Sequence, residues 1–218
     1  MFRMIRAGAI LIACGAFVTG AARAQTGPPS GVDQIEEDWQ VVIGTPSVEE
    51  AGPQITTTIS PVGDNTQFFV ALNLNYQDSP YQAGGYQVEA WNGNTLMANC
   101  PSSKWAQLNT SGETITWTQS MWISNGWLSY MMKNGNSTTW GTFGWAGDWS
   151  MFGMPFSPSS LDSYKPAVSV ANSGASWQAN RVQSMTLVRV RYYSGGALVY
   201  TDSTPRSIDL SPSVNTSP

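Results

Sequence analysis

Carboxylates are the only side chains in this sequence that suit common hydrolytic chemistry. The 218 residues contain no histidine, which excludes Ser-His-Asp and Cys-His nucleophile systems, histidine general bases and histidine-based zinc sites. The candidates for a catalytic pair are Glu89 and Glu113, with Asp148 as a third. A pair that cleaves glycosidic bonds must stand about 5 Å apart for retention, or about 6.5 to 9.5 Å apart for inversion. Isolated glutamates on strands are usually solvated, so we expect no catalytic residue and rank a glycoside hydrolase last among the functions considered.

The cysteines and glycines add no second kind of reactive site. Because no histidine is present to lower the pKa of its thiol, Cys100 is expected to be a small buried apolar residue rather than a nucleophile. No glycine loop ends in Lys-Ser or Lys-Thr, and no acidic loop has EF-hand spacing. We therefore expect no cofactor and no metal site of these kinds.

Aromatic residues offer a different chemistry, that of binding. The chain contains 10 Trp, 8 Tyr and 7 Phe, while charged residues make up only 11% of it. A pyranose has apolar C–H faces and a rim of hydroxyl groups, so it is matched by flat rings among short polar side chains. Trp and Tyr suit such half-wet positions because each has an apolar body and a polar tip. The composition is therefore typical of a surface that contacts sugars.

Three tryptophans fall on the polar faces of expected strands. Successive side chains of a strand point to opposite faces, so Trp122 and Trp140 each share a face with threonines, and Trp91 shares one with Gln87 and Glu89. We expect one ligand-binding sheet face, and its candidate residues are Trp91, Trp122, Trp140, Glu89 and, in the adjacent loop, Trp145 and Trp149. The alternative is that these rings pack under the loop over residues 144–166 as a second core.

The elements that must position these residues are strands. Apolar residues occupy every second position from 68 to 76, and this period of two predicts a strand with one apolar face. Asn and Gly supply the positive φ that tight hairpin turns require, so we expect turns at 92–94, 125–126, 134–136 and 194–196. The further expected strands cover residues 85–92, 95–99, 114–124, 127–133, 137–143, 167–171, 176–181, 183–193 and 197–202.

The overall pattern predicts one all-β domain. No segment has apolar residues at helical spacing between capping signals, and the sequence predicts a single antiparallel jelly-roll β-sandwich over residues 55–204. A polar, acidic segment over residues 25–54 precedes it, with a candidate first strand over 38–43, and a polar tail over 205–218 follows it. The proline-containing segment 144–166 is expected to be a large loop over one sheet.

The last predicted hairpin resembles that of one family of sandwiches. Residues 185–193, the turn Ser194-Gly195-Gly196 and residues 197–202 resemble the late hairpin of concanavalin A-like and laminin-G-like domains. This resemblance implies a concanavalin A-like jelly roll that binds carbohydrate. Related enzymes carry a Glu-x-Asp-x-x-Glu motif on one strand, whereas Glu36-Glu37-Asp38 has a different spacing and is expected to lie outside the core. The resemblance therefore implies binding rather than cleavage.

The first residues predict export. Arg3 and Arg6 precede an uncharged, mostly apolar stretch over residues 7–20, and Ala22-Arg23-Ala24 matches the pattern that a signal peptidase reads. We expect a signal peptide over residues 1–24 and a mature chain of 194 residues that begins at Gln25, because the apolar stretch is too short for a membrane span of about 20 residues. A competing interpretation is a lipid anchor on Cys14, since Leu11-Ile12-Ala13-Cys14 resembles a lipobox.

Charge narrows the choice of partner. Cleavage removes three of the ten cations, which leaves seven against fourteen carboxylates and a net charge of −7. Nucleic acid and anionic lipid surfaces are poor partners for such a chain. We expect a secreted, periplasmic or cell-surface protein without a transmembrane segment, whose partner is a neutral glycan or a cell-envelope component. Noncatalytic carbohydrate binding is the favoured function, and a structural or adhesive role in the envelope is the alternative.

Overall fold

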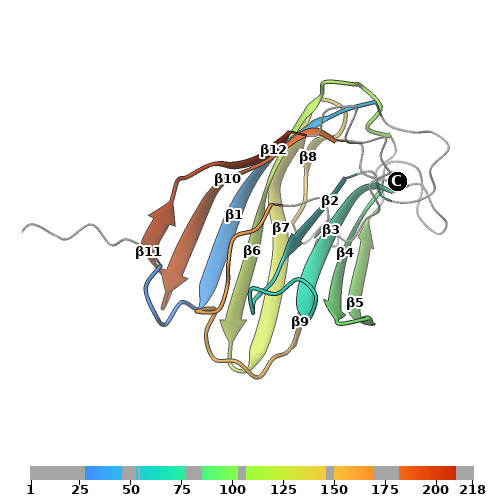
Figure 1. Cartoon of the computed structure of the whole chain (residues 1–218). Helices are drawn as coiled ribbons and strands as arrows, with labels where there is room; N and C mark the ends of the chain where they lie inside the picture. The colour runs from blue at the N-terminus through green and yellow to red at the C-terminus, as the bar shows by residue number, and fades with distance from the viewer. Residues whose placement is uncertain are drawn as a thin grey trace, which may run out of the picture.

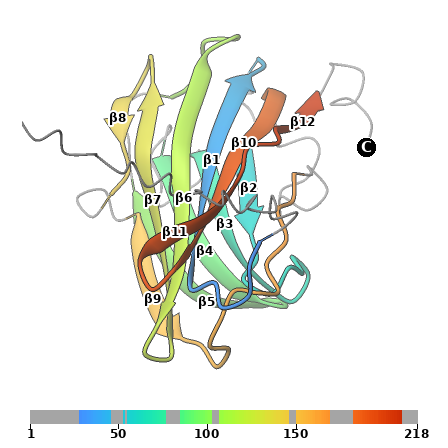
Figure 2. The ribbon, with the colours of Figure 1, turned by 90° about the vertical axis from the view of Figure 1, so that its left-hand side faces the viewer.

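The chain forms two antiparallel β-sheets, as Figures 1 and 2 show. The computed structural model describes residues 28–45, 53, 55–76, 85–102, 107–145, 150–168 and 182–209. Every regular element within these ranges is a strand, which confirms the predicted all-β class. None of the described residues belongs to a helix of the length and apolarity needed to cross a membrane. The predicted signal peptide, including Cys14, and most of the predicted tail lie outside the described residues.

The larger sheet has eight strands. Six of them form a continuous path, in the order β11, β10, β1, β6, β7, β8, while β12 pairs with β10 and β9 pairs with β7. Their bounds are Gln34–Ile43 for β1, Thr114–Ser124 for β6, Trp127–Ser137 for β7, Gly141–Phe143 for β8, Met151–Pro155 for β9, Val182–Ser194 for β10, Ala197–Asp202 for β11 and Arg206–Asp209 for β12.

The smaller sheet has four strands in the order β2, β3, β4, β5. Their bounds are Ile55–Ile59, Phe68–Tyr76, Gly85–Asn92 and Thr95–Ser102. The pairing of β4 with β5 contains a bulge: Ala90 pairs with Ala98 and Trp91 pairs with Leu96, so Met97 has no partner in the register. Leu96 and Met97 are both exposed at this irregular edge.

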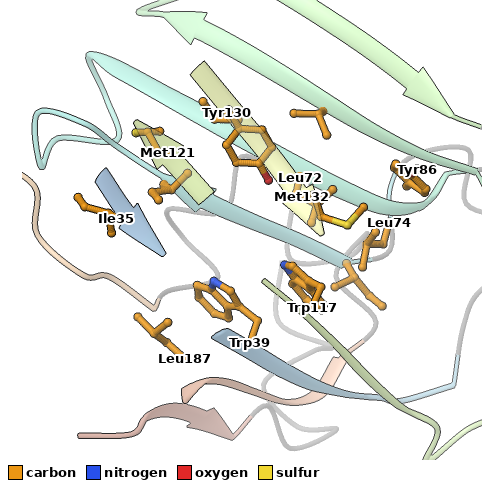
Figure 3. Close-up of a cluster of buried hydrophobic side chains, with 14 of the residues drawn as sticks. Ile35, Trp39, Leu72, Leu74, Tyr86, Trp117, Met121, Tyr130, Met132 and Leu187 are labelled. Carbon is orange, nitrogen blue, oxygen red and sulfur yellow. The ribbon is translucent and has the colours of Figure 1, made fainter. Parts of the chain in front are cut away.

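One apolar core lies between the sheets, as in a β-sandwich. Alternate side chains of β3 and β4 contribute to it, because Leu72 and Leu74 of β3 and Tyr86 of β4 are buried against the larger sheet. Figure 3 shows these residues near Trp39 and Trp117, whose rings stack with centroids 6.2 Å apart and planes 8° apart. The core therefore combines aliphatic side chains with aromatic pairs.

A carboxyl group lies inside this core. Glu37 is 1% exposed and accepts hydrogen bonds from Trp39 Nε1 (2.8 Å), Gln119 Nε2 (3.3 Å) and the hydroxyl of Tyr164 (2.6 Å). Burial raises its pKa to about 7, although the hydrogen bonds from Tyr164 and Trp39 and the charge of Arg206 oppose the shift. Glu37 is thus a buried polar centre that joins β1, β6 and the segment after β9.

The structure corrects the predicted start of the sandwich. β1 begins at Gln34 and lies in the middle of the larger sheet, between β10 and β6, so the segment expected to precede the sandwich contributes a central strand to it. The expectation that Glu36-Glu37-Asp38 lies outside the core is wrong, because Glu37 points into it. At the other end, β12 lies within the predicted polar tail and pairs with β10.

Several turn and loop predictions also differ from the structure. The turns at Asn125-Gly126 and Gly195-Gly196 are confirmed, with positive φ at all four residues. Asn134 also has a positive φ (55°), but it lies within β7, where the pairing with β6 is irregular, and does not end the strand. Of the predicted strands late in the chain, residues 167 and 168 are not in a strand, and 169–171 and 176–181 lie outside the described residues.

The segment 144–166 is not simply a loop over one sheet. Part of it forms β9, which pairs with β7 at the larger sheet. Beyond β9, Leu161 and Tyr164 are buried in the core between the sheets. Part of this segment therefore contributes to the core, and the prolines at 155, 158 and 166 limit its regular structure.

Candidate functional site

The outer face of the four-stranded sheet combines aromatic and polar side chains. Leu72 and Val88 point into the core, so their neighbours along β3 and β4 point outward. Three cross-strand pairs follow one another on this outer face: Phe69 with Trp91, Ala71 with Glu89, and Asn73 with Gln87. An aromatic pair and an amide pair thus stand on either side of one carboxylate.

Hydrogen bonds fix the position of the Glu89 carboxylate. Its Oε1 accepts a hydrogen bond from Gln87 Nε2 at 2.7 Å, and its Oε2 accepts from Asn73 Nδ2 at 3.2 Å and from Trp91 Nε1 at 3.3 Å. Asn73 is itself held by the Thr56 hydroxyl, which donates to Asn73 Oδ1 at 2.9 Å. The indole N–H of Trp91 therefore points at the carboxylate of Glu89, and this hydrogen bond restricts rotation of the ring.

Partial burial changes the acidity of Glu89. Removal from water raises its pKa above the ordinary value for a glutamate, while the hydrogen bonds from Trp91 and Asn73 oppose that shift. A half-buried carboxylate with a raised pKa beside aromatic rings is a frequent feature of binding and catalytic sites. Glu89 can accept hydrogen bonds from a hydroxylated ligand, or donate one when it is protonated.

The small side chain of Ala71 leaves a hollow in front of this carboxylate. The hollow has a volume of about 260 Å³ and is lined by Phe69, Ala71, Asn73, Glu89 and Trp91, with the β4–β5 turn at one end. Both rings of the aromatic pair are half-buried, so part of each remains open to solvent. The arrangement can stack an apolar ring face and accept hydroxyl hydrogen bonds at the same time.

The structure does not bring the predicted tryptophans onto one face. Trp91 lies in the four-stranded sheet, whereas Trp122 lies on β6 of the larger sheet, paired with Gln34 and Ser129. The predicted single face is therefore wrong, because strand parity determines the face of a strand and does not determine which sheet contains it. Trp149, together with Asp148, lies outside the described residues.

Trp140 packs toward the core rather than toward solvent. It lies in the turn between β7 and β8, and its ring is 5.2 Å from that of Phe143 and 6.2 Å from that of Tyr86, measured between centroids. Tyr86 belongs to the opposite sheet and is fully buried. For this ring, the alternative of additional core packing describes the structure better than a ligand platform.

Glu113 is used to stabilise a turn. Its Oε1 accepts a hydrogen bond from the backbone N–H of Thr139 and its Oε2 accepts one from the Thr139 hydroxyl, both at 2.6 Å. Glu113 is 5% exposed and directly precedes β6 of the larger sheet. Glu113 lies at the start of β6 in the larger sheet, whereas Glu89 points outward from the four-stranded sheet, so the two carboxyl groups belong to different sheets.

A cluster of charged residues on the outer face of the larger sheet was not predicted from the sequence. Arg191 bridges Glu36 (3.0 Å) and Asp38 (2.8 Å), Lys133 contacts Glu36, and Arg189 contacts Asp38. Each carboxylate meets two cations, and these contacts tie together β1, β7 and β10. These residues come from distant parts of the sequence, and no local pattern could have grouped them.

Phe69 and Asn73 are the site residues that sequence reasoning did not single out. The sequence did contain an indication of them, because both fall on the less apolar face of the predicted strand over 68–76. Only the pairing of β3 with β4, however, places them beside Trp91 and Glu89. Within the described ranges, no three histidine, cysteine, aspartate or glutamate side chains converge as metal ligands.

Comparison of the chain with protein-family models, with curated proteins and with solved structures finds no match.

Proposed function

We propose that this protein is an exported, noncatalytic carbohydrate-binding protein with a concanavalin A-like jelly-roll fold. Its ligand is a neutral glycan that binds on the outer face of the four-stranded sheet. The observation that carries the proposal is the hollow in which Trp91 and Phe69 flank the half-buried carboxylate of Glu89. The rings match the C–H face of a sugar, while Glu89 and Asn73 match its hydroxyl groups.

Charge and the surroundings of the carboxylate support a neutral, uncleaved ligand. The mature chain carries a net charge of −7, and a carboxylate in the hollow repels polyanions. Cleavage by the usual mechanisms needs two carboxyl groups at a defined separation, but Glu113 lies at the larger sheet, where it stabilises the β7–β8 turn. Glycan binding therefore requires only the residues that line the hollow, whereas hydrolysis would also require a second carboxyl group near Glu89.

A glycan array followed by three substitutions tests this proposal. We expect Trp91→Ala to weaken binding at least about tenfold, because a stacking aromatic at the centre of a site typically contributes 2 kcal/mol or more. Trp91→Phe should retain most of the affinity, and Glu89→Gln should weaken binding by removing a charged acceptor. Trp122→Ala, in the other sheet, is the matched control and should bind like the original protein.

Two results would overturn the proposal. Full binding by a folded Trp91→Ala variant, with folding checked by circular dichroism, would remove this site. Release of reducing sugar that disappears in Glu89→Gln would make the protein an enzyme. An absence of binding to every glycan on the array would favour the alternative function, a structural or adhesive role in the cell envelope.

A further inference from the structure

A second hollow lies on the larger sheet, where β7 meets β8. Its volume is about 630 Å³, and the side chains that line it include Lys133, Asn134, Asn136, Thr142 and Trp145. Trp145 is the most exposed of the large apolar side chains in the described ranges, at 64%. The four-stranded sheet likewise places a tryptophan, the half-buried Trp91, beside a hollow with polar lining residues.

The backbone at Trp145 is held in an unfavourable conformation. Its φ is 83°, in the left-handed region that bulky residues rarely adopt, and Gly144 before it has a φ of 92°. A non-glycine residue in such a region is strained and persists only where the surroundings enforce it, often at functional sites. The exposed ring of Trp145 gains little from packing, so packing of this ring in the core does not offset the strain of its backbone.

Backbone contacts with β7 enforce this conformation. The N–H of Trp145 donates to the carbonyl of Met132 at 2.8 Å. The hydroxyl of Ser150, which is fully buried, lies 2.6 Å from the carbonyl of Trp145 and 3.0 Å from that of Met132. A Cβ on Gly144 would stand 2.7 Å from the Met132 sulfur and 3.0 Å from the Met132 carbonyl oxygen, and the φ of 92° also favours glycine at this position. The indole therefore projects from a rigid support.

The lining of the hollow suits a neutral, hydroxylated ligand. Asn134, Asn136 and Thr142 are exposed and present amide and hydroxyl groups. The only cation among the lining residues, Lys133, is paired with Glu36 at 2.5 Å, so its charge is partly neutralised. Stacking on Trp145 with hydrogen bonds to amides and a hydroxyl is the recognition chemistry of a sugar ring.

We propose that Trp145 and the side chains around this hollow form a second neutral-glycan site. It shares the ligand class of the proposed function but none of its residues, because Trp91 lies in the other sheet. Two sites on different sheets allow one protein to hold two glycan chains, or two segments of one chain. Binding to a polymer then gains from multivalency, whereas a short oligosaccharide occupies each site separately.

Affinity electrophoresis in native gels tests this inference. The probes are soluble mixed-linkage β-glucan, xyloglucan, arabinoxylan and galactomannan, and the samples are the original protein, Trp91→Ala, Trp145→Ala and the double variant. We expect Trp91→Ala to retain retardation by at least one polysaccharide, and the double variant to lose it. Trp127→Ala is the matched control. Trp127, on β7, is also an exposed tryptophan (50% exposed) but does not line the hollow, so this variant should behave like the original protein.

The crossed variants separate this inference from the first site. If the double variant and Trp91→Ala are retarded equally by every polysaccharide, the second site does not exist. The same conclusion follows if neither of them is retarded by any polysaccharide. If Trp145→Ala loses retardation that Trp91→Ala keeps in full, the second site stands and the first fails. Trp145 is exposed, so Trp145→Ala should fold normally, and circular dichroism checks that it does.

Discussion

Glu37, Glu89 and Glu113 carry the same carboxyl group in three different surroundings. Glu113 is bonded at both oxygens by one threonine and stabilises a turn. Glu89 is half-buried beside a hollow, with its pKa raised by burial. Glu37 lies in the core, where burial raises its pKa to about 7. At the scale of the residue, the role of each glutamate follows from the groups that contact it and from its removal from water.

Glu37 should make stability depend on pH. Because the pKa of Glu37 is about 7 in the folded protein and ordinary in the unfolded chain, the folded protein keeps a proton that the unfolded chain releases between about pH 4.5 and 7. The free energy of unfolding should therefore fall as pH rises through this window, by about 3 kcal/mol. Denaturant titrations of the original protein and Glu37→Gln at pH 5, 6, 7 and 8 measure it.

The glutamine variant isolates this contribution. Its side chain has nearly the same shape and does not titrate, so the difference in stability between the two proteins should change with pH even if other groups titrate in both. The free energy of unfolding of Glu37→Gln should rise relative to that of the original protein as the pH increases from 5 to 8. A constant difference across that range would show that Glu37 titrates as an ordinary glutamate.

At the scale of the element, the sequence predicted strands better than it predicted where they begin. The sequence predicts the strands over 68–76, 85–92, 114–124 and 197–202 with the bounds that the structure has. The first three alternate apolar and polar side chains, and the fourth follows the turn at Gly195-Gly196. β1 was expected from residue 38, since Glu36 and Glu37 interrupt that alternation. Their partners Lys133 and Tyr164 lie 97 and 127 residues further along the chain, and no local pattern contains them.

The central position of β1 predicts a contrast with the edge strand β11. Ile35 is fully buried on β1, whereas Leu198 is 55% exposed on β11. We expect Ile35→Ala to lower the free energy of unfolding by about 3 kcal/mol, because it removes buried methyl groups and leaves a cavity. Leu198→Ala should change it by less than about 0.5 kcal/mol. Urea denaturation measures both, and equal losses would contradict the assignment of β1 as a central strand.

At the scale of the whole molecule, the candidate sites lie on different sheets. Parity correctly placed Trp91 beside Glu89, but it could not assign strands to sheets, because that assignment depends on pairing between segments far apart in sequence. For the same reason the sequence could not distinguish Trp140, which packs toward the core, from Trp145, which is exposed. The composition indicated a surface suited to sugars, and only the fold shows where aromatic rings and hollows coincide.

Export is a prediction about the whole chain. We expect the mature protein to begin at Gln25, because Ala22-Arg23-Ala24 has the small residues that signal peptidase requires. N-terminal sequencing and intact mass of the protein recovered from the cell envelope or the medium decide it. A mass that corresponds to a diacylglyceryl group on Cys14 would replace the secreted form with a lipid-anchored one.

The irregular pairing of β4 with β5 also affects how separate copies of this protein meet. β5 is an outer strand of its sheet, and such strands can act as templates on which another chain adds a strand, which leads to aggregation or strand exchange. Here the unpaired Met97 interrupts the register, and Pro101 has no backbone N–H to offer. An incoming strand would find neither a straight edge nor a complete row of donors. The bulge that exposes Leu96 and Met97 therefore also works against fibril growth from this edge.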